Sequence, residues 1–388
     1  MEPNETRRKG QTTIEEYFGD LPDPRRGPAI LHRLIDILTI ALLGVVCGAD
    51  DYEAIAEFGE RRADWLKTFL ALPNGIPSHD TFNRVFAMLK PDAFEARYLK
   101  WMQAVAPMKA GEHIALDGKV LRRSLDRYGG QEAIKMVSAC AVERGLVLAQ
   151  QAVPDDTNEI SILPELLKLL ALKDCIVTVD AANCQVENAQ IILNQGGDFV
   201  FAVKGNQGNL QERIRQCFEE LPGTPRSRHT VAFETREKGH GRQERRHYTV
   251  VNDPFCIDYI NQDHRDWRIG SIIRVERERT WPHKTELNVS YYCSSLDGTD
   301  PHRLSRCIRN HWGIENGTHW VLDVTFKEDL SRIRTGFGPE NFAALRHMAL
   351  NLLKSEKSTR KSVAHKRFAT ALDPDYLLKI LQAGLSQP

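Results

Sequence analysis

Between His113 and Gly205 the chain alternates short strand-like runs with helix-like segments. Three strand-like runs come first, and a helix, a strand, a helix and a strand follow them. The runs are, in order, IALDG, MVSACAVE, GLVLAQQAV, EISILPELLKLLAL, CIVTVDAA, QVENAQIILNQ and DFVFAVKG. Because helices that connect strands of one sheet act as crossovers, this order predicts a mixed α/β sheet.

The region before this alternation, residues 31–108, has the spacing of apolar residues that is typical of helices. Its longest apolar run, Leu34 to Gly48, has about fifteen residues, fewer than the roughly 20 that cross a bilayer. Ser78 is the predicted N-cap of a later helix. We therefore expect a small all-helical domain at 31–108, a flexible leader at 1–30 and no membrane segment.

The region after the alternation changes character twice. Residues from about 225 to 300 are rich in Val, Ile, Tyr and Thr, which predicts a β-rich insertion. Helical spacing then returns in PHRLSRCIRNHWGIENGTHWVLDVTF and in NFAALRHMALNLLKSE. These changes predict one α/β domain at 109–354, which contains the insertion, and a basic C-terminal tail at 355–388.

The composition excludes several classes of protein. Hydrophobic residues make up 41% and charged residues 27% of the 388 residues, which excludes a disordered chain, a collagen and a coiled coil. Lysine plus arginine (52) equals aspartate plus glutamate (52), so only local basic patches remain for binding nucleic acid. Eight scattered cysteines without a C-x-x-C motif indicate reduced thiols, and no signal peptide is visible, so we expect a cytoplasmic protein.

Two aspartates end strand-like runs and are candidates for a metal site. Asp117 closes IALD, and Asp180 closes CIVTVD. Neighbouring strands that both end in carboxylates bring two acids to one sheet edge, and Mg²⁺ prefers such oxygen ligands. A pair of ions held in this way supports phosphoryl transfer. The alternative for each aspartate is a solvated strand end or a helix cap.

A third acid, Glu315, lies in the later helical stretch. His311, Glu315, His319 and Asp323 recur every four residues, which places them on one face of a helix. One interpretation is a catalytic carboxylate whose neighbours hold DNA. Another is a site for zinc or another transition metal, although the spacing does not match H-E-x-x-H. The third is an exposed polar helix face, which two nearby tryptophans disfavour.

Nine segments in one order resemble the transposases of bacterial insertion sequences, in the subgroup that includes the H-repeat-associated proteins. The resemblance runs from about residue 18 to residue 354, and the shared order is far more specific than any one segment. The segments are FGDLPDPRRG, DILTIALLGVVCGADDYEAIAEFG, WLKTFLALPNGIPSHDTFNRVFAML, IALDGKVLRRS, DDTNEI, IVTVDAANCQ, FVFAVKGNQ, EKGHGRQERR and RNHWGIENGTHWVLDVTFKED.

The resemblance implies a DDE transposase with a ribonuclease-H-like catalytic core. The matching motifs place the first Asp at Asp117, the second at Asp180 and the Glu at Glu315. In this family these residues are catalytic and hold two Mg²⁺ or Mn²⁺ ions. The resemblance also identifies the β-rich stretch with the insertion of related enzymes, and the helical N-terminal region with an associated, DNA-binding domain.

Residues near the three acids are the expected DNA contacts. Basic clusters neutralise phosphates, although a solvated charged surface is the ordinary alternative. The expected contacts are Lys119, Arg122, Arg123, Lys204, Arg242, Arg245, Arg309, His311 and Trp312. Related enzymes carry a Tyr, an Arg and a Lys around the Glu, and here Ile308, His311 and Leu322 occupy those positions.

We therefore expect a DNA transposase that cuts insertion-sequence ends and joins them to target DNA by metal-dependent phosphoryl transfer. Its expected partners are double-stranded DNA, as terminal inverted repeats and as target, and a second copy of the chain. Two alternatives stay open. One is a metal-dependent nuclease without strand transfer, and the other is an inactive transposase-derived DNA-binding protein.

Overall fold

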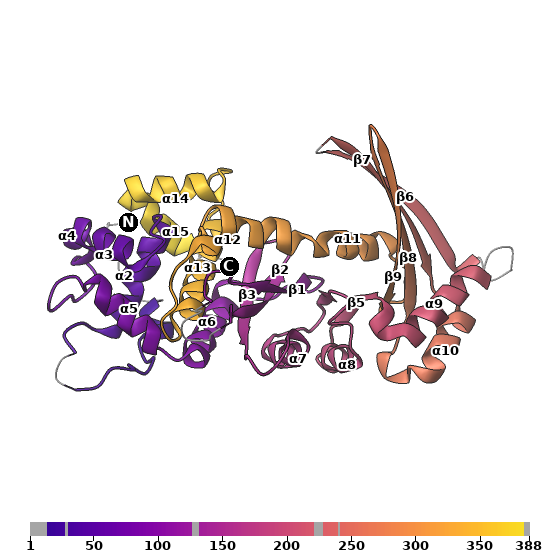
Figure 1. Ribbon diagram of the computed structural model, residues 1–388, viewed down its shortest axis with the longest axis horizontal. Coiled ribbons are helices and arrows are strands. Elements are labelled where there is room, and N and C mark those ends of the chain that lie inside the picture. The colour runs from indigo at the N-terminus through magenta and orange to yellow at the C-terminus, as the bar shows by residue number, and fades with distance from the viewer. Residues whose placement is uncertain (1–13, 28–29, 126–131, 221–227, 240, 384–388) are drawn as a thin grey trace. The chain divides into compact units, whose positions relative to one another are not determined.

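The chain folds into two compact units, and each unit combines separate stretches of sequence. The computed structural model describes residues 14–27, 30–125, 132–220, 228–239 and 241–383 (Figure 1). Unit 1 consists of Met1–Met108, Gly118–Glu159 and Ile314–Pro388, and unit 2 consists of Lys109–Asp117 and Ile160–Gly313. The strand β1 (His113–Val120) therefore begins in unit 2 and ends in unit 1.

Unit 2 contains parallel strands joined by helical crossovers, which confirms the predicted mixed α/β sheet. The start of β1 pairs with β4 (Ile176–Val179), and β4 pairs with β5 (Asp198–Val203), both in parallel. The crossover helices are α7 (Glu159–Leu169) and α8 (Val186–Asn194). Figure 1 shows α11 (Pro301–His311) on the opposite side of these strands from α7 and α8.

The same unit continues into a long antiparallel sheet, in the stretch predicted to be rich in β-strands. Its strands are β6 (Thr230–Gly239), β7 (Arg242–Val251), β8 (Ser271–Trp281) and β9 (Lys284–Ser294). They follow the order β5-β9-β8-β7-β6, so β9 joins this sheet to the parallel strands. The helices α9 (Gly208–Glu220) and α10 (Pro254–Asp263) were not predicted by the sequence patterns.

One face of the β6–β9 sheet packs on α11. The shared core contains Tyr248 and Val250 from β7, Ile273 from β8, and Leu304 and Ile308 from α11. The other face meets α9 near the base of the strands, where the Phe218 and Tyr291 rings lie 6.0 Å apart. The far ends of the strands extend beyond these helices (Figure 1).

Unit 1 is mainly helical, and its N-terminal helices occupy the region predicted to be helical. They are α2 (Leu34–Val46), α3 (Tyr52–Arg61), α4 (Ala63–Leu66), α5 (His79–Met88) and α6 (Pro91–Val105). Every residue of α2 is buried. Ser78 caps α5 as predicted, since its side chain accepts a hydrogen bond from the Thr81 amide at 3.4 Å.

The expected leader at 1–30 is only partly described. Residues 1–13 and 28–29 lie outside the described residues. Residues 14–18 are helical, and Phe18 is buried with its ring 5.6 Å from that of Phe94 in α6.

The antiparallel pair β2 (Lys135–Ala141) and β3 (Leu146–Val153) also belongs to unit 1. Directly after β1, the Leu121 amide donates a hydrogen bond to the Ile134 carbonyl at 2.8 Å, so the end of β1 leads into β2. The long helix α13 (Gly338–Ser355) packs against β3 and against α2, α5 and α6. It is the element that joins the C-terminal part of the chain to the N-terminal helices.

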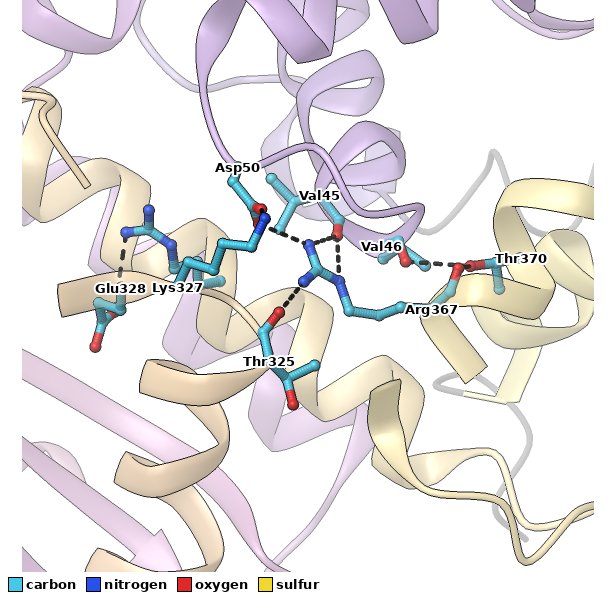
Figure 2. Close-up of polar contacts among 9 residues, drawn as sticks. Val45, Val46, Asp50, Thr325, Lys327, Glu328, Arg367 and Thr370 are labelled. Atoms are coloured by element: carbon cyan, nitrogen blue, oxygen red, sulfur yellow. Dashed lines mark hydrogen bonds and ion pairs between the residues drawn. The ribbon is translucent and has the colours of Figure 1, made fainter. Parts of the chain in front are cut away.

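The basic C-terminal stretch folds onto these helices. It forms α14 (Val363–Leu372) and α15 (Pro374–Ala383), and both pack against α13. Figure 2 shows the Arg367 side chain between α2 and the segment after α12 (Trp320–Val324), where it donates hydrogen bonds to the Val45 and Thr325 carbonyls. Lys366 is also buried and lies 3.2 Å from a Glu356 oxygen. The sequence predicted a basic C-terminal tail here, and the Lys366 and Arg367 side chains are instead buried in contacts within unit 1.

None of the described helices combines the length and the apolar character that a membrane crossing requires.

Candidate active site

Asp117 lies within β1 and Asp180 directly follows β4, each one residue beyond the last pair of the parallel β1–β4 register. The register of β1 on β4 ends with Leu116 opposite Val179. Each aspartate is the next residue, so both carboxylates stand at the same edge of the sheet. Both are half-buried. Unit 2 therefore brings together the first two of the three predicted acids.

The loop after Asp180 is held by amide side chains. The amide and Nδ2 of Asn183 donate to Oδ1 of Asp180 at 3.0 and 2.8 Å, which orients that carboxylate. Asn206 donates to the Ala181 carbonyl at 2.8 Å, and Gln207 donates to the Cys184 carbonyl at 3.0 Å. The sequence analysis did not single out Asn206 and Gln207 as positioning residues, although they lie in the segment FVFAVKGNQ.

Near Asp180, two histidines form hydrogen bonds to one threonine hydroxyl. Oγ1 of Thr178 lies 2.8 Å from Nε2 of His113 and 2.9 Å from Nδ1 of His311. Burial lowers the pKa of His311 to about 4, although the Asp180 carboxylate opposes this shift. Burial, and then the nearby His311, lowers the pKa of His113 to about 3. Both rings are neutral at pH 7. His311, an expected DNA contact, is half-buried and makes a part-buried hydrogen bond to Thr178, and its role in DNA binding stays a prediction.

Glu315 belongs to unit 1 and opens a π-helical turn, Glu315–His319. π-Helical turns inside helices occur frequently at functional sites. The Glu315 side chain is exposed at the surface of its unit, and partial burial raises its pKa. His319 is buried, so Glu315 and His319 do not share the helix face that a four-residue spacing predicted.

A metal cluster is not present within the described part of the chain: no three His, Cys, Asp or Glu side chains there form a group that could hold an ion. Asp117 and Asp180 supply two of the oxygen ligands that Mg²⁺ prefers. Glu315 lies in the other unit, so the convergence of all three acids stays a prediction.

The Transposase DDE domain family matches residues 109–352, and the family described as DDE_Tnp_1-associated matches residues 15–102. The chain is 36% identical to "H repeat-associated putative transposase YhhI" of Escherichia coli strain K12, over 96% of this chain and 99% of that protein. The chain belongs to the DDE transposases.

A second relative is also named as a transposase. "Putative transposase YncI" of Escherichia coli O157:H7 is 37% identical, over 95% of this transposase and 94% of that protein. A solved piggyBac transposase in a synaptic complex with hairpin DNA matches with a TM-score of 0.41 and 11% identity, over 96% of this chain and 76% of that chain. The family match and the two relatives from Escherichia coli confirm the resemblance to H-repeat-associated transposases.

Lys119 of this transposase, an expected DNA contact, is engaged inside unit 1. Its ammonium lies 2.6 Å from Oε2 of the buried Glu328 and also pairs with Asp323. Oε1 of Glu328 lies 4.0 Å from the buried Arg346 guanidinium. The Lys119 side chain is 12% exposed. Lys119 therefore fixes the end of β1 to the segment that follows Glu315.

The other expected DNA contacts have more accessible positions. Arg122, Arg123 and Lys204 are exposed, and Arg122 also lies 3.4 Å from Asp329. Three further arginines of unit 2 are among them, namely Arg242 and Arg245 on β7 and Arg309 on α11. Trp312, at the end of α11, is 49% exposed. Their roles in DNA binding stay predictions.

Glu159, which the sequence analysis did not single out, lies against the strand that carries Asp117. A Cβ atom on Gly118 would lie 2.5 Å from Oε2 of Glu159. Only glycine leaves room for that carboxylate beside the strand. The sequence pointed to Glu159 only through its place in DDTNEI, one of the nine segments that carry the family resemblance.

Proposed function

We propose that this DDE transposase cuts insertion-sequence ends and joins them to target DNA, with Asp117, Asp180 and Glu315 as its catalytic carboxylates. Two Mg²⁺ or Mn²⁺ ions, when bound, would activate the attacking oxygen and stabilise the leaving oxygen. The proposed partner is duplex DNA, as terminal repeats and as target. The proposed setting is the cytoplasm, with the chain as a homodimer on DNA because transposition brings two ends together.

The shared edge of β1 and β4 is the observation that carries this proposal. Asp117 and Asp180 are hard oxygen donors on adjacent strands, which suits Mg²⁺ better than a softer transition metal. Asn183 fixes one oxygen of Asp180, so the carboxylate is oriented before any ligand binds. The neutral His311 behind it adds no positive charge that would compete with a cation.

We also propose that the sheet is ribonuclease-H-like. The parallel strands β1, β4 and β5, their crossover helices and the antiparallel pair β2–β3 directly after β1 support this assignment. In this scheme the β6–β9 sheet is the insertion between the second Asp and the Glu, and the helices of residues 31–108 are the associated DNA-binding domain.

The test is cleavage and joining by purified full-length protein. The substrate is a labelled duplex that carries one terminal repeat from the genomic flank of the gene, with a supercoiled plasmid as target. Asp117→Asn, Asp180→Asn and Glu315→Gln should each lower cleavage by at least about 1000-fold while the fold is retained, because each removes one catalytic carboxylate.

Three results would contradict the proposal. Full activity in any one variant removes that residue from the site. Cleavage without joined product supports the nuclease alternative. Metal-independent DNA binding with no cleavage in Mg²⁺ or Mn²⁺ supports the inactive, transposase-derived protein.

A further inference from the structure

The strand register gives the β6–β9 sheet two chemically different faces. On one face, which packs on α11 at its base, Arg242 and Arg246 from β7 lie beside Arg277 and Arg279 from β8. Arg309 of α11 adjoins them through Glu237, with N–O distances of 2.9 and 3.2 Å. We call these five residues the arginine face.

The cross-strand pairs of this face bring like charges together. Arg246 stands directly opposite Arg277 in the β7–β8 register. Like charges directly opposite each other destabilise a sheet. On the other face the same two strands pair Arg245 with Glu278, which are opposite charges. Arg236 also stands opposite Arg245 on the other face, but the arginine face has the larger excess of positive charge.

The carboxylates on this face are shared among several arginines. Glu244 is buried, pairs with Arg246, and lies 3.6 Å from Arg242 and 3.7 Å from Arg279. Glu237 is shared between Arg246 and Arg309. Glu286, also on this face, pairs with Lys284 in the β8–β9 hairpin. These glutamates hold guanidinium groups in place, and they are fewer than the arginines of this face.

Two guanidinium groups have unused hydrogen-bonding capacity. Within the part of the chain that the structure describes, no carboxylate forms an ion pair with Arg277, and its pKa is lowered by burial and by the neighbouring Arg279. Nε of Arg279 is buried with no hydrogen-bond partner among the described residues. A guanidinium group carries several N–H donors in one plane, which suits phosphate because two of them can bind it together.

The arginine face is connected to the acid edge of unit 2. Arg309 is two residues from His311 on α11, and His311 bonds to Thr178, which is two residues before Asp180. A linear polyanion on the arginine face would therefore run toward the carboxylates of Asp117 and Asp180. Duplex DNA is such a polyanion, since its phosphates follow one another at a regular spacing. The charges of an acidic peptide have no fixed spacing.

We propose that the arginine face binds the phosphate backbone of duplex DNA and guides it toward Asp117 and Asp180. This inference rests on the proposed function and assigns one surface of the transposase to its substrate. It also divides two residues that sequence analysis grouped together. Arg242 contacts DNA, and Arg245, which pairs with Glu234 on the other face, does not.

The test measures the salt dependence of DNA binding by the full-length protein. Fluorescence anisotropy with a labelled duplex of about 30 base pairs, in EDTA, gives the slope of log K against log [KCl]. Arg277→Ala/Arg279→Ala should reduce that slope by about 1.8, or about 0.9 for each lost phosphate contact, and weaken binding at least tenfold at low salt.

The matched control is Arg236→Ala/Lys238→Ala, which removes the same charge from the other face of the same sheet. We expect its slope to equal that of the wild type. Arg277→Lys/Arg279→Lys keeps the charge and should keep most of the slope, which separates lost contacts from a damaged fold. Thermal unfolding of each variant gives a second check on folding.

Several outcomes would overturn the inference. These are an unchanged slope in the Arg277/Arg279 alanine variant, an equal loss in the control variant, or equal or tighter binding of single-stranded DNA of the same length. The proposed function fails separately, because it fails if Asp117→Asn still cleaves.

Discussion

The buried histidines of unit 2 couple the stability of the candidate site to pH. His113 and His311 are neutral when folded because burial lowers their pKa values to about 3 and about 4. In the unfolded chain each takes up a proton near its ordinary pKa of about 6.5. Between pH 6.5 and pH 4 the unfolded state therefore binds more protons, and the free energy of unfolding falls as the pH falls.

The expected loss is about 1 kcal/mol per pH unit for each histidine, because each takes up nearly one proton on unfolding. Urea denaturation between about pH 7 and about pH 5 measures it. His113→Gln/His311→Gln should flatten the slope, while part of it remains through the buried His319 and His347 of unit 1. Equal slopes in the wild type and the double variant would contradict this prediction.

At the scale of elements, α13 acts as a polar partner for the strand β3. Oδ1 of Asn351 accepts a hydrogen bond from the Val147 amide at 2.9 Å, and its Nδ2 donates to the Val147 carbonyl at 2.7 Å. This one side chain makes the two bonds that a neighbouring strand would make. Asn351→Leu removes this partner of the buried Val147 amide, while the Val147 carbonyl still accepts from the Tyr98 hydroxyl, and it should cost about 2 kcal/mol of unfolding free energy.

Met348→Leu is the matched control for this prediction, because it changes another buried residue of α13 at nearly constant volume. We expect it to cost less than about 1.5 kcal/mol. Chemical denaturation of both variants gives the comparison. A loss for Asn351→Leu no larger than that for Met348→Leu would show that the two hydrogen bonds contribute little.

Local sequence patterns predicted where the strands of unit 2 lie. They did not predict which face of the sheet each residue lies on, or which residues it contacts. The strands β4 and β5 could be predicted because each is a continuous apolar run between loops. The helix α9 was missed because most of its surface is polar, although Leu210, Ile214 and Phe218 have helical spacing. The opposite faces of Arg242 and Arg245 follow from the period of two in a strand, once the strand is known.

Contacts between residues far apart in the sequence explain what the local patterns did not predict. Lys119 and Arg367 each lie in a basic cluster, which predicts an exposed surface. Their carboxylate and carbonyl partners are Glu328, Asp50, Val45 and Thr325, which no local pattern connects to them. The three proposed catalytic acids could be predicted from the sequence because the order of the motifs along the chain marks them. Their spatial convergence stays a prediction, since Glu315 belongs to unit 1 and the two aspartates belong to unit 2.

For the whole molecule, the C-terminal helices are part of the folding unit that contains the N-terminal helices. Arg367 donates to the Val45 carbonyl at 2.9 Å and lies 3.2 Å from Asp50, and Thr370 donates to the Val46 carbonyl at 3.1 Å. These contacts complete the C-terminal end of α2, which is buried along its whole length. Helix ends that lose such partners inside a protein carry unsatisfied carbonyls.

A chain that ends at Lys361 lacks α14 and α15 and should therefore lose much of the stability of unit 1. We expect a lower melting temperature, by at least about 10 °C, and earlier protease cleavage within residues 31–108. The full-length variant Arg360→Met/Lys361→Met removes charge from the exposed part of the same stretch and should melt like the wild type. If the shortened chain melts at the wild-type temperature, the prediction is wrong. Residues 31–108 would then be stable without α14 and α15, and α2 would stay folded with its C-terminal end exposed.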